Sequence, residues 1–477
     1  MKRRLSLRTL LVVVLVMALS VVVHAQVVIR HMGNWDAFDP NSDIVAEAIE
    51  KVTGYKVEYS MLPVENMNEV LSLRVSNVGA YDSLKLNSQQ YNMLTAQKAL
   101  LPLDDLLEKY GQRILEVIKE ETWEAAKVDG KIYGVPEVPP APNVNHVILA
   151  RKDILDELNL AVPETVDEFY DVLKTIRKEK NMLPLAMAQH NFALSVVTSG
   201  FGIYHAWMEV DGAITHQVEH PKMKEYVEFM AKLYEENLID QDFPVNATQH
   251  VVEKFTSGRA AMIPFAWWQA PAVLAALEQN VPGSEWVVIP PLKDESGNRG
   301  IEVDGGILWF VGIPQGAKNV EDVVKWWNAK LELDNHKYIA LGDEGVHYYE
   351  ENGAYFPILP VFEDERNMAN WSLTGVDQEL YPTYWASRVR KNAHMSKVYD
   401  AMQELRQWGS VNPVAWAPAL PTVSKYTQSL NLLTQDNLVN FIAGGDDVRN
   451  YGDFVDAWRA SGGQESTVEV NNWYQSR

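Results

Sequence analysis

The 477-residue chain contains no cysteine. This absence excludes disulfide bonds, cysteine nucleophiles and zinc sites built from thiolates. The stability of the fold must therefore come from the burial of apolar side chains. A chain of this length has room for two lobes or more, since single hydrophobic cores stop growing at roughly 250–300 residues.

Long apolar runs are also scarce, and the longest lies at the N-terminus. Basic residues at positions 2–4 precede an apolar stretch over 10–23, and His24 and Ala25 follow it. A basic start, an apolar run too short to span a bilayer and small residues at its end are typical of a cleaved secretory signal. We expect an exported, soluble mature protein that begins near Gln26. An uncleaved membrane anchor is the alternative, but it would need a longer apolar run.

Positive charge is in short supply. The chain carries 42 lysine and arginine residues against 64 aspartate and glutamate residues, which gives a formal charge of −22. Removal of the predicted signal, residues 1–25, takes away four positive charges and no negative ones, so the formal charge falls to −26. Such a surface repels nucleic acid and anionic lipid and does not attract an anionic ligand. We expect no nucleic-acid partner and a neutral or cationic ligand.

What the sequence does contain is an alternation of strand and helix patterns. Residues 26–62 are predicted to form a strand, a helix and a strand, which implies parallel strands. Ligands of open α/β sheets bind beyond the carboxyl ends of such strands. Trp35 and Asp36 lie in the loop at that place, and Asn87 follows the next predicted strand, 81–86. These three residues are candidates for ligand contact.

The same alternation continues over residues 143–303, which predicts a second α/β lobe. Thr165 and Glu168 have the spacing of a capping box at the start of one of its helices. Before this lobe, the sequence Asp129-Gly130 predicts a tight hairpin turn.

Four prolines within residues 136–142 stiffen the backbone where the chain leaves the first lobe, 26–138. A second strand-like stretch, near 304–312, follows the second lobe, and no flexible linker joins the two lobes. We therefore expect the chain to cross between lobes, build the second and cross back. Residues 308–360 would complete the first lobe, and 361–477 would form a helical region that packs on the lobes. Stiff crossings permit a hinged closing motion.

Six stretches carry a resemblance to a known family: WEAAKVDGKIYGVPE (123–137), ARKDILDELNLAVPETVDEFYDVLKTI (150–176), KFTSGRAAMIPF (254–265), DGGILWFVGIP (304–314), GDEGVHYY (342–349) and GDDVRNYGDFVDAWRASGGQESTVEVNNWY (445–474). They resemble the extracellular solute-binding proteins of ABC importers, of the large carbohydrate-binding type, and the last two are similar to its LipO-like branch. The resemblance implies a periplasmic-binding-protein-like fold, in which two α/β lobes close on a ligand.

The same resemblance implies what the protein binds. The expected ligand is a carbohydrate, in particular an oligosaccharide, and the expected partners are the transmembrane subunits of an ABC permease. The resemblance also implies a monomer without catalytic activity or cofactor. We expect no metal site, because the eleven histidines have no metal-binding spacing.

One position departs from the family pattern. Many relatives carry a lipid-modified cysteine directly after the signal, whereas this chain has Gln26 there. We therefore expect that the protein is not a lipoprotein. A freely diffusing protein is retained only where an outer membrane encloses it, which favours a periplasmic location over a secreted one.

Sugars bind to exposed aromatic faces accompanied by amides and carboxylates. The chain has 15 tryptophans, of which Trp267 and Trp268 are adjacent. Adjacent side chains point in different directions, so at most one of the pair can share the core. With Gln269 beside them they are the main candidates for the sugar site. The alternative is one tryptophan in the core and one on the surface of a lobe.

Further candidates follow strands or stand beside the two crossings: Trp35, Asp36, Asn87, Glu137, Gln189, Asn191, Asp304 and Trp309. Each has a purely structural alternative. Trp35 could close the end of a sheet, Glu137 could be a solvated carboxylate, and the polar cluster around His190 could cap a helix.

Two other functions share parts of these observations. A binding protein for oligopeptides or another polar solute would have the same fold. A secreted glycoside hydrolase would need two carboxylates about 5 to 9 Å apart across a cleft, and 64 acidic residues leave such a pair open. The sequence contains no GxSxG elbow, phosphate-binding loop or zinc signature.

Overall fold

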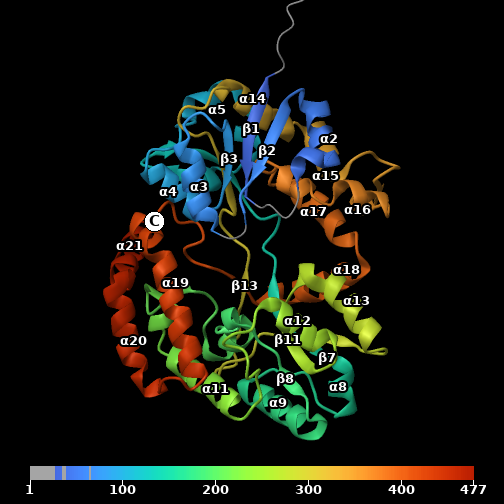
Figure 1. Cartoon of the computed structure of the whole chain (residues 1–477), viewed down its shortest axis with the longest axis vertical. Helices are drawn as coiled ribbons and strands as arrows, with labels where there is room; N and C mark the ends of the chain where they lie inside the picture. The colour runs from blue at the N-terminus through green and yellow to red at the C-terminus, as the bar shows by residue number, and fades with distance from the viewer. Residues whose placement is uncertain (1–26, 35–38, 64–65, 477) are drawn as a thin grey trace, which may run out of the picture.

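The computed structural model describes residues 27–34, 39–63 and 66–476. Over these ranges the chain forms two α/β lobes, which stand one above the other in Figure 1. The predicted signal segment and the candidates Trp35 and Asp36 lie outside the described residues. In the described part of the chain, no helix has the length and apolar character of a membrane span.

Lobe I is built on a five-stranded sheet in the order β2-β1-β3-β14-β6. Its strands are β1 (Val28–Gly33), β2 (Lys56–Met61), β3 (Ser83–Leu86), β14 (Trp309–Gly312) and β6 (Gly134–Glu137). β1 is parallel to β2 and β3, as the predicted strand–helix–strand unit requires, whereas β14 is antiparallel to β3 and β6. The sheet is therefore parallel only where helical crossovers connect its strands, and it is antiparallel where the chain returns from the other lobe.

The helices of lobe I surround this sheet. They are α2 (Ile44–Thr53), α3 (Met67–Ser76), α4 (Ser88–Ala96), α5 (Asp104–Tyr110), α6 (Gln112–Val117), α7 (Glu120–Ala126), α14 (Val320–Leu331), α15 (Leu333–Leu341), α16 (Val361–Arg366) and α17 (Tyr381–Arg390). The hairpin of β15 (Tyr348–Glu351) and β16 (Ala354–Pro357) packs on α17. Trp326 and Trp327 of α14 are buried in the core of lobe I, where the neighbouring apolar side chains of this helix also lie.

Lobe II is built on a four-stranded sheet in the order β12-β7-β11-β8. Its strands are β12 (Trp286–Ile289), β7 (His146–Arg151), β11 (Ala260–Ala266) and β8 (Leu183–Leu185). The helices around it include α8 (Lys152–Glu157), α9 (Val166–Lys180), α10 (Ser195–Thr198), α11 (Met223–Glu235), α12 (Thr248–Thr256) and α13 (Ala270–Asn280). A separate hydrophobic core holds this lobe together.

Two local sequence predictions are confirmed. The hydroxyl of Thr165 accepts a hydrogen bond from the Glu168 backbone N–H at 3.2 Å, and the Glu168 carboxylate accepts one from the Thr165 N–H, which is a capping box at the start of α9. Asp129 and Gly130 both have positive φ and connect β4 (Lys127–Val128) to β5 (Lys131–Ile132) in an antiparallel hairpin.

The two predicted crossings between the lobes run side by side. In the register of β6 with β14, Glu137 pairs with Trp309. Beyond the strands, the Asp304 N–H donates a 3.0 Å hydrogen bond to the carbonyl of Asn143. Two adjacent stiff segments of this kind are suited to a hinge between the lobes.

The C-terminal region does not form one unit. Phe362 of α16 and Tyr381 and Tyr384 of α17 belong to the core of lobe I, whereas the buried side chains that follow, from Val389 on, belong to the core of lobe II. The second group comprises Val389 in the last turn of α17 and the helices α18 (Ala393–Gln403), α19 (Pro421–Ile442), α20 (Tyr451–Trp458) and α21 (Gln464–Gln475). The chain therefore crosses between the lobes a third time, from the last turn of α17 to α18 (Figure 1).

A further contact joins the C-terminal helices to lobe I. α19 stands beside lobe II in Figure 1, and its first turns lie against α4 of lobe I. There, the Asn92 side-chain amide donates a 3.2 Å hydrogen bond to the Ser424 hydroxyl. The start of α19 thus forms part of the boundary between the lobes.

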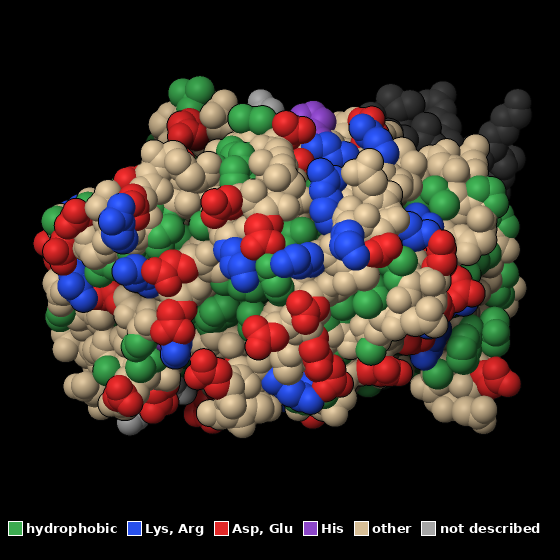
Figure 2. Space-filling view, turned by 90° about the horizontal axis from the view of Figure 1, so that it is seen from below, with side chains coloured by type: hydrophobic (Ala, Val, Ile, Leu, Met, Phe, Trp, Pro, Cys, Tyr) green, Lys and Arg blue, Asp and Glu red, His purple; other side chains and the backbone are tan. Residues whose placement is uncertain are grey.

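The surface remote from this boundary has no large area of one charge. Figure 2 looks at the end of lobe II that is farthest from lobe I, and acidic and basic side chains are interspersed over it. The negative formal charge of the chain is therefore not gathered into one patch on this face.

Candidate solute-binding site

Two adjoining cavities lie where the crossings meet lobe II. The first has a volume of about 550 Å³ and the second about 410 Å³. His146, Ser195 and Glu302 line both, so the two cavities form one groove. We call it the interlobe groove.

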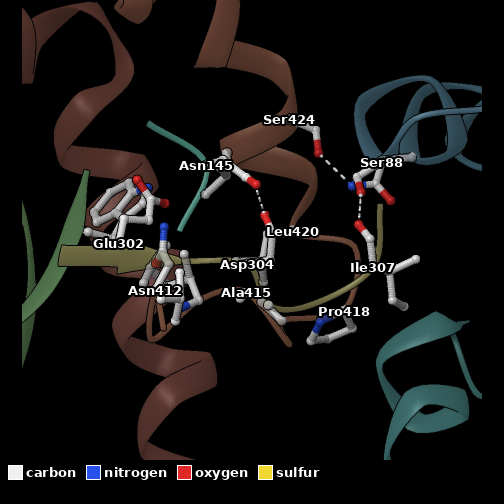
Figure 3. Close-up of a pocket in the computed structure, with 18 of the residues that line it drawn as sticks. Ser88, Asn145, Glu302, Asp304, Ile307, Asn412, Ala415, Pro418, Leu420 and Ser424 are labelled. Carbon is white, nitrogen blue, oxygen red and sulfur yellow. Dashed lines mark hydrogen bonds between the residues drawn. The ribbon is translucent and has the colours of Figure 1, made fainter. Parts of the chain in front are cut away.

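The first cavity is enclosed by both lobes (Figure 3). Ser88 and Asn92 come from α4 of lobe I, Trp207 comes from β9 (Trp207–Val210) of lobe II, and Asn412 and Ser424 come from the C-terminal region. Its walls are rich in amides and hydroxyls, which both donate and accept hydrogen bonds. This is the chemistry that a sugar, with its many hydroxyls, requires.

Asn145 connects the crossings to the wall of the groove. Its side-chain N–H donates a 2.6 Å hydrogen bond to Asp304 Oδ1, and these two side chains face each other in Figure 3. The side-chain oxygen Oδ1 of Asn145 accepts a 3.0 Å hydrogen bond from Trp267 Nε1. One side chain on the first crossing therefore binds the second crossing and the turn that carries the tryptophan pair.

Asp304 occupies an environment that disfavours its charge. Burial raises the pKa of its carboxyl to about 6, and the nearby carboxylate of Glu302 acts in the same direction. Hydrogen bonds with Asn145 and Asn143 oppose this shift. The pKa of Asp304 therefore lies nearer to neutrality than that of an ordinary aspartate.

The tryptophan pair is divided between core and groove. Both lie in the short helix η5 (Trp267–Gln269) that follows β11. Trp267 is only 8% exposed and makes edge contacts with Trp385 and Tyr399, whereas Trp268 is 48% exposed and lines the second cavity. An exposed indole on a cavity wall is a platform for the apolar face of a sugar ring.

Three other predicted residues also line the interlobe groove. Gln269 and Asn191 line the second cavity, and Asp304 lines the first. Asn191 and Gln269 each also accept a 2.9 Å hydrogen bond from the backbone N–H three residues earlier, which fixes their side chains. Gln189, in the same turn as Asn191, is not part of the lining of either cavity.

The predicted residues of lobe I lie at the other side of the crossings. Asn87 caps α4, since its side chain accepts a 2.9 Å hydrogen bond from the Gln90 N–H. Glu137 is buried in a 3.0 Å ion pair with Lys85. Trp309 packs edge-on against Trp371. None of the three lines the two cavities, and their contact with a ligand remains a prediction.

Burial has the largest influence on the pKa of the Glu137 carboxyl. It raises the pKa of this carboxyl, although the ammonium group of Lys85 acts in the opposite direction. An ion pair inside lobe I is a structural role that the sequence alone did not reveal, because Lys85 is 52 residues away in the chain.

Several lining residues were not among the sequence candidates. Asn143 and Asn145 stand directly after the proline-rich segment, so the position of this segment at the crossing could have identified them. Glu302 immediately precedes the second crossing in the same way. Asn412 and Ser424 carry no such signal, because the turn of the C-terminal region toward lobe I is a long-range feature of the fold.

Comparison with known proteins identifies the family. The family described as bacterial extracellular solute-binding protein matches residues 45–330. This is more than half of the chain, and the chain therefore belongs to this family. The two-lobed fold predicted from the sequence is confirmed.

Individual relatives agree with this assignment. An uncharacterized protein in the butB 5′ region of Niallia circulans is 40% identical over 253 residues, which cover 53% of this chain and 99% of the relative. The polygalacturonan/rhamnogalacturonan-binding protein YtcQ of Bacillus subtilis is 21% identical over 461 residues, which cover 91% of this chain and 89% of YtcQ.

A solved structure has the same fold. The ABC-transporter substrate-binding protein FusA of Streptococcus pneumoniae, in complex with kestose, matches with a TM-score of 0.71 and 16% sequence identity. The match covers 94% of this chain and 99% of FusA. This likeness shows that the two chains share a fold.

Proposed function

We propose that this protein is the receptor of an ABC importer, which captures an oligosaccharide in the interlobe groove and delivers it to the transmembrane subunits of the permease. The observation that carries this proposal is the groove itself. An exposed indole, Trp268, stands on a wall of the second cavity that is largely apolar, and the adjoining first cavity supplies amides, hydroxyls and carboxylates. The carbohydrate ligands named for YtcQ and FusA support the same class of ligand.

The capture mechanism follows from the position of the groove. Its walls come from lobe I, lobe II and the crossings, so a ligand that contacts both lobes stabilises the arrangement in which they are closest. The lobes would move as the units predicted from the sequence, 26–138 with 308–360 and 143–303, and the helices α18 to α21 would move with lobe II. The closed form would present a composite surface to the permease.

A calorimetric titration tests the proposal. The panel contains neutral and acidic oligosaccharides, with short peptides as controls for the alternative ligand class. Trp268→Ala is expected to weaken sugar binding at least about tenfold, because stacking on an aromatic platform contributes of the order of 1 kcal/mol or more. Tyr349→Ala is the matched control, since Tyr349 is 46% exposed on the β15–β16 hairpin and lines neither cavity.

Binding of peptides but not of sugars would contradict the proposal. So would an unchanged sugar affinity in Trp268→Ala. We also propose that the protein releases its sugar intact, as expected of a binding protein. Chromatography of the sugar after prolonged incubation tests this, and cleavage products would favour the glycoside hydrolase alternative.

The location of the protein is part of the proposal. The chain belongs to an extracellular solute-binding family, which supports a location outside the cytoplasmic membrane. We propose that it is a freely diffusing monomer, with no lipid anchor at Gln26. Mass spectrometry of the mature N-terminus checks the cleavage and the absence of a lipid anchor, and an acylated or uncleaved terminus would contradict them.

A further inference from the structure

Among the described residues, the lining of the interlobe groove has acidic side chains but no lysine or arginine. Glu302 lines both cavities and Asp304 lines the first. Among the described residues that line the two cavities, none is lysine or arginine. A groove that bound a carboxylated sugar would need such a cation or a comparable set of donors to replace the water that the carboxylate loses.

The two histidines of the groove do not supply this charge. His146 lines both cavities and His190 lines the second. Burial lowers the pKa of both imidazoles, and no carboxylate outweighs this effect. Both rings are therefore neutral at pH 7, where they can form hydrogen bonds with hydroxyls but add no positive charge.

Two lysines of lobe I are buried and closed off from solvent. Lys85 and Lys330 are each only 2% exposed. Lys85 is bound to the Glu137 carboxylate and to the carbonyl of Leu373, and Lys330 is bound to the carbonyl of Ser372. Neither lysine lines the two cavities. Both side-chain nitrogens are engaged inside the lobe, and burial lowers the pKa of Lys330 well below its ordinary value. The two lysines therefore do not offset the carboxylates of the groove.

We propose that the interlobe groove selects uncharged oligosaccharides and rejects uronate oligosaccharides, and that Glu302 and Asp304 determine this selectivity. The inference rests on the proposed function of the groove. A carboxylate on the ligand would face two carboxylates, Asp304, which is partly buried, and Glu302, whose side chain is 57% exposed, and like charges repel. Hydroxyls of a neutral sugar, in contrast, donate hydrogen bonds to both side chains.

The test compares ligands that differ only in charge. Trigalacturonic acid and its methyl ester share one skeleton, and gluco-, manno- and fructo-trisaccharides extend the neutral series. Titrations at pH 7.5 and about 0.15 M salt are expected to give binding to at least one neutral trisaccharide and at least about tenfold weaker binding to its uronate counterpart. A uronate that binds as tightly as its neutral counterpart, or more tightly, overturns the inference and leaves the proposed function intact.

Removal of the two charges tests which residues are responsible. In Glu302→Gln with Asp304→Asn, the ratio of the uronate Kd to the neutral Kd is expected to fall at least about fivefold, whatever the change in the neutral Kd itself. The control is Glu121→Gln with Glu124→Gln, which removes two charges from α7 outside both cavities. An equal fall of the ratio in both double variants overturns the assignment to Glu302 and Asp304. Absence of binding in every series contradicts the proposed function itself, and the inference with it.

Discussion

Asn145 Nδ2 donates a hydrogen bond of 2.6 Å to Asp304 Oδ1, and this contact joins the first crossing to the second at the floor of the groove. Since Asn145 also accepts a hydrogen bond from the indole of Trp267, the hinge and the binding wall share one polar connection. A change of charge on Asp304 therefore acts on the hinge and on the site together.

Asp304→Asn is expected to change how stability depends on pH. The pKa of Asp304 is raised to about 6 in the folded protein. This carboxyl therefore contributes most to stability when it is protonated, below about pH 4, and the contribution is lost as the pH rises through 6. The variant retains the acceptor for Asn145 without the charge. Its melting temperature relative to the wild type should therefore rise between pH 4.5 and 7.5, and parallel curves would contradict the buried-charge account.

Trp267→Ala is expected to destabilise the fold, in contrast to Trp268→Ala. Trp267 is 8% exposed and packs against Trp385 and Tyr399, so its truncation leaves a cavity and costs about 3 kcal/mol. Urea unfolding of both single variants measures the difference. Equal loss of stability in the two variants would show that the division of this pair between core and groove is wrong.

Gly306→Ala is expected to disturb the crossing. Gly306 has a φ of +74°, and a Cβ there would lie 2.0 Å from the carbonyl oxygen of Ala415. Gly297 has a similar φ of +84° but no atom within 4 Å of the same position, so Gly297→Ala is the matched control for backbone strain alone. We expect a loss of about 1 kcal/mol in the control and of the order of 3 kcal/mol or more in Gly306→Ala. Equal losses would mean that segment 412–420 yields freely to the second crossing.

Lys85→Met is expected to cost more than the removal of both partners of the ion pair. The Lys85 and Glu137 side chains are 2% and 10% exposed, so the single variant leaves a buried carboxylate without its main counterion. Such a loss costs about 3 kcal/mol, part of which Lys85→Met with Glu137→Gln should regain. Chemical denaturation of the single and double variants measures the coupling. Additive losses would contradict the ion pair.

Local chemistry made much of the fold predictable. The spacing of Thr165 and Glu168 determines where α9 begins, and Asp129-Gly130 determines a turn, because both features depend on neighbouring residues only. The crossing after Gly134 was predictable for the same reason, since proline stiffens its own backbone. The division of the C-terminal region between α17 and α18 was not, because it depends on which core each helix reaches.

The site was predictable in part. Trp268, Gln269, Asn191 and Asp304 follow strands or crossings, and the structure brings them to one groove, whereas their contact with a ligand remains a prediction. Glu137 satisfies the same sequence criterion, yet Lys85 holds it inside lobe I. A pattern in the sequence places a residue at the end of a strand, but the partner that determines its exposure comes from elsewhere in the chain.

A crystal structure of the protein with a bound neutral oligosaccharide tests the central claim most directly. The account predicts a sugar ring on the indole of Trp268, with hydroxyls within hydrogen-bonding distance of Glu302, and both lobes in contact with the ligand. A sugar bound outside the interlobe groove, for example in the separate cavity between Glu121, Trp416 and Trp473, would contradict it.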